Sequence, residues 1–394
     1  MLKFFTSHRW IALIMGLVLL VWSFCPGSNR FEQGVYSVLM GMVPAASAPV
    51  KTVVVTLNDG QQAMASVSYI KLAKLLGSLK SAGSKAVGLM VPLDHPQTTM
   101  NEEALSTIRE SFSDKKLATK QGMFNAIQQL DPDASLRKAL QSSNRIVLAV
   151  TDAMSGGLTP LSVEPPNNEL AALLPVLASP PAIYMPGMPP LKMFSDLLPT
   201  AVLPSLVSSR YPTISAATPL ALPFAGQYLP SFELLLTARA LGIPAKSLIV
   251  HPGKGVMMGT AWVATDAGLR TYPRSQDSLI SVISATDVLA GKHKKQLRGK
   301  AVLVGVDSGQ TVRLPGGSKV SHLLGTAHAV NALINESLVK VPHWSLGVQR
   351  GALLLILIYL VLIPVRLRGL VGLVGGLVLA FLILNGSLLM LTLK

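Results

Sequence analysis

The chain has 394 residues, of which half are hydrophobic and only 13% are charged, and its mean hydropathy is +0.48. A purely soluble protein is less apolar than this, so part of the chain is expected to lie in a membrane. The single cysteine excludes an intrachain disulfide. The net charge of +15 is spread along the sequence, apart from one basic run at residues 292–300.

Three apolar segments are candidates for membrane helices: residues 10–25, 347–365 and 369–393. A helix needs roughly 20 apolar residues to cross the hydrocarbon core, so the first two are near the minimum length and the third is ample. The expected domains are an N-terminal transmembrane anchor (1–26), a central domain (27–346) and a transmembrane hairpin (347–394). The alternative for the first segment is a signal peptide cleaved near Ala48, but Pro49 directly after it disfavours cleavage.

Basic residues near the ends of these segments set the expected orientation. Lys3 and Arg9 precede the first segment, and Arg366 and Arg368 form the turn of the hairpin. Lys and Arg concentrate on the cytoplasmic side of membrane helices. The N-terminus and the turn are therefore expected inside, and the central domain and Lys394 outside, where nucleic acid is not an expected partner.

Small and polar residues in the last apolar segment indicate helix packing within the membrane. Gly372 and Gly376 form a G-x-x-x-G spacing that permits close contact between helices, and Asn385 can hydrogen-bond a neighbouring helix. The short turn before this segment favours packing inside the hairpin. Oligomerisation through the same face is the alternative.

The first half of the central domain alternates between strands and helices. Apolar, β-branched runs predict buried strands at 52–57, 86–91 and 145–150. Helical spacing predicts helices at 67–82, 101–112 and 134–141, the last capped by Asp133. Short strands that are apolar throughout are typical of a parallel sheet covered on both faces.

Residues 154–230 hold fifteen of the 27 prolines but are apolar, so an ordered, irregular excursion packed on the domain is expected rather than a disordered linker. The elements expected after it are a helix at 231–241, antiparallel strands at 247–250, 256–264 and 269–272, a helix from Ser284, a fourth parallel-type strand at 301–306 and a helix at 322–337. The predicted fold class is therefore α/β: a mainly parallel buried sheet with an antiparallel extension, on a membrane anchor of three transmembrane helices.

Each of the four predicted parallel strands is followed by an aspartate: Asp59, Asp94, Asp152 and Asp307. Because the carboxyl ends of parallel strands meet at one edge of a sheet, these side chains could form a pocket for a ligand or a cation. Basic residues such as Arg313 or Lys254 could offset their charge. The alternative is local, since aspartate often caps helices and stabilises turns after strands.

Recognised catalytic and metal-binding motifs are not found. The histidines show no H-E-x-x-H context, no G-x-S-x-G occurs, and Gly253-Lys254-Gly255 lacks the spacing of a phosphate-binding loop. We therefore expect no enzyme activity, no metal site and no cofactor. The basic run at 292–300 is interpreted as a solvated loop, with a lipid or partner contact as the alternative.

Several stretches together resemble the type 2 CHASE domain (CHASE2), an extracellular sensory domain of bacterial membrane receptors. The stretches are TVVVTLND, TDAGLRTYPR and the late signature formed by Ser284–Leu289, Leu297–Gly305, His328-Ala329 and Asn331–Leu333. The resemblance covers about residues 28–345. Members usually continue through three membrane helices into a cytoplasmic output module, whereas this chain has two such segments after the domain and ends at Lys394.

The resemblance implies a periplasmic sensory domain in a bacterial inner membrane. We expect a non-enzymatic sensory or scaffolding subunit that recognises an envelope signal or partner. It would pass the signal through membrane helix packing to a separate protein. The expected partners are the lipid bilayer and either further copies of the chain or a separate membrane or signalling subunit. Two alternatives stay open: a structural building block of an oligomeric envelope assembly, and an outward-facing enzyme at the aspartate edge.

Overall fold

The computed structural model describes residues 48–57, 67–97, 131–150, 158–164, 191–203, 217–224, 226–266, 268–274, 279–307, 309, 311–314, 318–339, 351 and 354. Within these ranges no helix is long and apolar enough to cross a membrane. The predicted membrane segments, apart from Gly351 and Leu354, lie outside the described residues, as do Gly372, Gly376 and Asn385. The predicted helix at 101–112 also lies outside them.

A six-stranded parallel sheet forms the centre of the domain, in the order β13-β1-β14-β2-β3-β5. Its strands are β1 (Thr52–Thr56), β2 (Ala86–Met90), β3 (Ile146–Val150), β5 (Thr200–Val202), β13 (Ser281–Ser284) and β14 (Ala301–Gly305). The four predicted parallel strands are confirmed as its four central members. They are apolar throughout because both faces of the sheet are covered.

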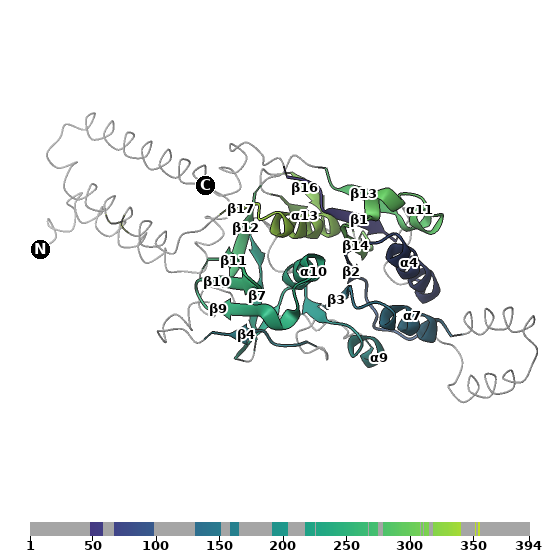
Figure 1. Cartoon of the computed structure of the whole chain (residues 1–394), viewed down its shortest axis with the longest axis horizontal. Helices are drawn as coiled ribbons and strands as arrows, with labels where there is room; N and C mark the ends of the chain where they lie inside the picture. Colours follow the sequence, from purple (N-terminus) through teal and green to yellow (C-terminus); the bar gives the residue numbers. More distant parts are fainter. Residues whose placement is uncertain are drawn as a thin grey trace, which may run out of the picture.

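Helices cover both faces of this sheet (Figure 1). One layer contains α4 (Tyr69–Ser81), α7 (Pro132–Gln141) and α11 (Ala285–Leu289), and the other contains α10 (Phe232–Leu241) and α13 (His322–Ile334). Each layer encloses its own apolar core. The cap predicted for α7 was wrong: Pro132 takes the first helical position, so Asp131 rather than Asp133 accepts the hydrogen bond from Ala134 N.

The close approach of α10 to the sheet depends on Gly88 in β2. A Cβ atom at this position would lie 2.6 Å from Phe232 Cζ and 2.7 Å from Leu236 Cδ2. Any side chain here would push α10 away from β2. The glycine in an otherwise apolar strand therefore sets the distance between the two layers.

The antiparallel extension is a second sheet, in the order β11-β10-β9-β4. Its strands are β4 (Ser162–Val163), β9 (Leu248–His251), β10 (Gly255–Met258) and β11 (Ala261–Ala264). The prediction of a single strand at 256–264 was wrong, because a turn at Gly259 and Thr260 divides this segment into β10 and β11. β12 (Arg270–Pro273) does not pair with β11 as expected; it pairs with β6 (Thr218–Pro219) and with β17 (Leu338–Val339).

The remaining elements are short: the hairpins β7 (Ala221–Phe224) with β8 (Gln227–Pro230) and β15 (Thr311–Arg313) with β16 (Lys319–Ser321), the helices α9 (Lys192–Ser195) and α12 (Lys294–Leu297), and the 3₁₀ turn η2 (Ala245–Ser247). The described parts of the proline-rich excursion are ordered and contain short extended pieces, as predicted. One of these pieces, β5, is an edge strand of the central sheet.

Candidate functional site

The carboxyl ends of the four central strands lie side by side in the order β1, β14, β2, β3. The segments that carry Asp307 and Asp94 therefore leave the sheet from adjacent positions. Asp59 and Asp152 lie outside the described residues, and Asp94 and Asp307 follow the paired strands β2 and β14. The structure places Asp94 and Asp307 after neighbouring strands and describes contacts of these two aspartates.

Asp307 has a local structural role. Its side chain is exposed, and its Oδ1 accepts a hydrogen bond from the backbone N–H of Gly309 at 3.2 Å. This contact holds the turn after β14, in the way that aspartate commonly stabilises turns. Lys254, one of the cations expected to offset the aspartates, belongs instead to the turn between β9 and β10 of the antiparallel sheet.

Asp94 pairs with the neighbouring histidine. Asp94 Oδ1 lies 2.9 Å from His95 Nδ1, and the side chains are 24% and 67% exposed, respectively. The hydroxyl of Tyr69 donates a hydrogen bond to the carbonyl of His95 at 2.8 Å. Burial, together with the negative charges of Asp133 and Asp94, raises the pKa of Tyr69 to about 12. Tyr69 therefore stays protonated and keeps donating to the loop.

Gln97 fixes the same loop to two helices. Its Oε1 accepts from Tyr69 N at 2.8 Å, its Nε2 donates to the carbonyl of Val67 at 2.7 Å, and its N–H donates to Asp133 Oδ1 at 3.0 Å. Ser68 provides no side-chain cap for α4. Gln97, which lies far along the chain, accepts the hydrogen bond from the first N–H of the helix instead. Sequence reasoning missed these contacts of Tyr69, Gln97 and Asp133, since no local pattern links residues from three elements.

The loop after β2 is thus a rigid support for one carboxylate and one imidazole at the surface. Such a pair can bind a polar or charged ligand by hydrogen bonds. Of the two described members of the predicted aspartate set, Asp94, with His95 beside it, fits ligand recognition better, and the contact of Asp307 fits a structural role.

A second site of interest joins the first and last parts of the described domain. We call it the tether junction and define it as residues 48–51 together with residues 331–339. The buried Asn331 accepts a hydrogen bond from Lys51 N at 2.8 Å, and Asn335 Nδ2 donates to the carbonyl of Pro49 at 2.8 Å. The chain entering β1 is therefore fixed to the C-terminal end of α13.

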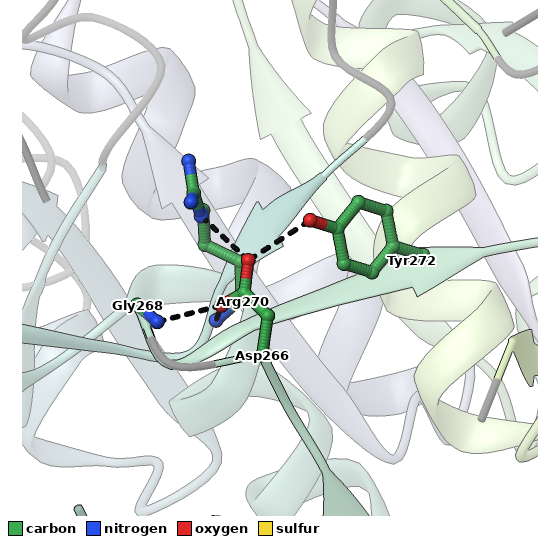
Figure 2. A network of polar contacts seen from close by, with 4 residues as sticks. All are labelled: Asp266, Gly268, Arg270 and Tyr272. Carbon is green, nitrogen blue, oxygen red and sulfur yellow. Dashed lines mark hydrogen bonds and ion pairs between the residues drawn. The ribbon is translucent and has the colours of Figure 1, made fainter. Parts of the chain in front are cut away.

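Asp266 stabilises the strand that borders this junction (Figure 2). Its Oδ1 accepts from the backbone N–H groups of Gly268 and Arg270, both at 2.9 Å. Its Oδ2 accepts from Arg270 Nε at 3.0 Å and from the hydroxyl of Tyr272 at 2.9 Å. Tyr272 lies in β12 opposite Val339 of β17, so the carboxylate supports the strand pair through which the described domain ends.

The sequence profile of the CHASE2 domain matches residues 12–364. The chain belongs to the CHASE2 domain family. CHASE2 domains are sensory domains. Searches of curated proteins and of solved structures found no match to the chain.

The late CHASE2 signature has structural roles in this chain. Ser284 Oγ accepts from Thr286 N and caps α11, and Leu297 is fully buried. Gly299 has a φ of +72°, a left-handed conformation that favours glycine, directly before β14. Asn331 holds the tether junction. The signature therefore specifies the approach to β14 and the contact between the two ends of the domain.

Proposed function

We propose that the protein is a non-enzymatic sensory subunit, anchored in a bacterial inner membrane with its CHASE2 domain in the periplasm. The domain recognises an envelope signal or partner and passes the signal to a separate protein through the packing of transmembrane helices. Membership in a sensory family supports the recognition role. The tether junction supports the transmission role, and it is the observation on which the proposal depends.

The tether junction joins the chain that enters the domain after the first predicted membrane segment to the chain that leaves it toward the predicted hairpin. Asn331 and Asn335 fix residues 49–51 to α13, so a shift of α13 relative to β1 also shifts the entering chain. A ligand changes such an equilibrium only if it binds the two states unequally. The loop that carries Asp94 and His95 lies at the carboxyl ends of the strands, and residues 48–51 precede the amino end of β1, so a signal would have to cross the length of the sheet.

Purification of the full chain from native membranes with a mild cross-linker tests this proposal. We expect a cytoplasmic signalling protein to copurify with the wild-type chain. Gly372→Leu with Gly376→Leu should reduce its amount, because the hairpin helices would no longer pack closely. Thermal unfolding of the variant should match that of the wild type, which shows that the CHASE2 domain is intact. A chain that always purifies alone contradicts the proposal.

A second candidate function is a building block of an oligomeric envelope assembly. Among the described strands, the edge strand β13 pairs only with β1. Its Val282 is 54% exposed, and Leu279, two residues before the strand, is 91% exposed. An apolar, unpaired edge of this kind favours association with another chain. This function predicts a defined ring or array in detergent that Val282→Lys disrupts, and monomers at every protein concentration would argue against it.

A further inference from the structure

The four central strands share a sequence feature at their amino ends as well as at their carboxyl ends. A basic residue directly precedes each of them: Lys51 before β1, Lys300 before β14, Lys85 before β2 and Arg145 before β3. Since the strands are parallel, all four residues lie at the amino-end edge of the sheet. Asp94 and Asp307 follow the opposite ends of β2 and β14, so these cations and the two described carboxylates lie at opposite edges of the sheet.

Backbone hydrogen bonds show that these four residues are neighbours. Ala301 N donates to the carbonyl of Lys51 at 2.9 Å, Lys85 N to that of Lys300 at 2.9 Å, and Val87 N to that of Arg145 at 2.9 Å. Adjacent strands lie about 4.8 Å apart. The four cations therefore form a continuous row along the edge.

Two further basic residues join this row. Gly299 N donates to the carbonyl of Gly83 at 2.9 Å, which places Arg298 beside the turn between α4 and β2. Lys80 Nζ donates to the carbonyl of Ser142, at the end of α7. We call these six residues the basic edge: Lys51, Lys80, Lys85, Arg145, Arg298 and Lys300. All are exposed except Lys300, which is partly exposed, and none forms an ion pair with a carboxylate of the described chain.

The basic edge lies at the same end of the sheet as the tether junction. Lys51 belongs to both, and the contacts of Asn331 and Asn335 bring the end of α13 to this position. The two connections toward the predicted membrane segments therefore leave the domain beside the row of cations. The positive charge of the basic edge and the position of these two connections both favour the membrane surface as its partner.

We propose that the basic edge binds the anionic phospholipid headgroups of the membrane in which the chain is anchored. This inference rests on the membrane anchoring in the proposed function. The contact would hold the strands upright on the bilayer, with the Asp94 loop directed away from it. Each basic residue that reaches an anionic surface changes the ratio of docked to undocked domain by about fivefold. The attraction is screened by salt over about 10 Å at ordinary ionic strength.

The test uses the full chain with Cys25→Ser, inserted into bilayer discs of phosphatidylcholine with or without phosphatidylglycerol. A dye on Asn144→Cys reports from the basic edge, and a dye on Ser318→Cys reports from the β15–β16 hairpin, which follows Asp307 in the chain. Both positions are exposed. A nitroxide on the lipid headgroups quenches any dye that comes close. We expect quenching at position 144 to rise with phosphatidylglycerol and to fall with salt, and position 318 to be unaffected.

Charge-changing variants identify the residues that carry the contact. Lys51→Gln with Lys85→Gln and Arg298→Gln should lower the docked-to-undocked ratio by about a hundredfold. The matched control is Lys246→Gln with Lys254→Gln and Lys319→Gln, which removes the same charge at exposed positions outside the basic edge and should leave quenching unchanged. Thermal unfolding confirms that both triple variants are folded.

The outcomes separate this inference from the proposed function. Release of the chain from the bilayer by alkaline carbonate would overturn the anchoring and the lipid contact together. A chain that stays inserted but shows equal quenching at position 144 in both lipids would overturn the lipid contact alone. Loss of a copurifying acidic protein in the first triple variant, without any change in quenching, would also overturn it and assign the edge to a protein partner.

Discussion

Glu233 shows how a single buried charge affects this domain. The residue lies in the first turn of α10, is 4% exposed, and its Oε2 has no hydrogen-bond partner among the described residues. Burial raises the pKa of Glu233 to about 7, although hydrogen bonds from its own backbone and from Ser231 act in the opposite direction. The carboxyl group therefore keeps its proton in the folded state at pH values where the unfolded chain is ionised.

The free energy of unfolding should consequently fall as the pH rises from about 4.5 to about 7, because only the folded state binds the proton in this window. Glu233→Gln should remove this pH dependence, which is a change on the order of 3 kcal/mol in the free energy of unfolding. Thermal unfolding between about pH 5 and about pH 8 measures the change. The exposed Glu336→Gln is the control and should leave the curve unchanged. An unaltered pH dependence in Glu233→Gln would contradict the prediction.

At the scale of elements, the packing of α10 on β2 gives a direct prediction about glycine. Gly88→Ala should lower the free energy of unfolding by about 1–3 kcal/mol, since its Cβ would overlap Phe232 and Leu236. Gly77→Ala is the matched control: nothing lies within 4 Å of its Cβ, and alanine favours the helix by up to about 1 kcal/mol. Denaturant unfolding of both variants measures the difference, and equal midpoints would argue against the close approach.

The Asp266 cluster predicts that β12 depends on one carboxylate. Asp266→Ala removes four hydrogen bonds from a mostly buried turn and should cost about 2–4 kcal/mol of stability. Hydrogen exchange should then increase first in β12 and β17. Asp287→Ala, which removes an exposed pair with Lys292, should have little effect on either measurement. Unchanged exchange in β12 would show that the strand is held by other contacts.

Much of the architecture could be predicted because the central strands are apolar on both faces. Short runs that are apolar throughout are typical of a parallel sheet with helices on both sides. β5 and β13 could not be found in this way, since they have three and four residues and pair only at the edges. Of the site, the sequence predicted the shared edge of Asp94 and Asp307 but not the contacts of Tyr69 and Gln97, which depend on the approach of α4 to the loop after β2.

At the scale of the whole molecule, the proposed function places the domain outside the cytoplasm, held by the segments that connect to its amino-end edge. The predicted hairpin then places Lys394 on the outer side. Alkaline phosphatase fused after Lys394 should be active in whole cells, and β-galactosidase fused at the same residue should be inactive. The reverse pattern would mean that one membrane segment is assigned wrongly.

The position of β14 between β1 and β2 has a consequence for biosynthesis. β1 and β2 are made early, yet each pairs with a strand that the ribosome adds only near the end of the domain. Closing a loop of this length is slow, so the sheet is completed in one late step. Under the proposed topology, most of the domain would therefore cross the membrane before this central strand is available, which is the unfolded condition that a translocation channel requires.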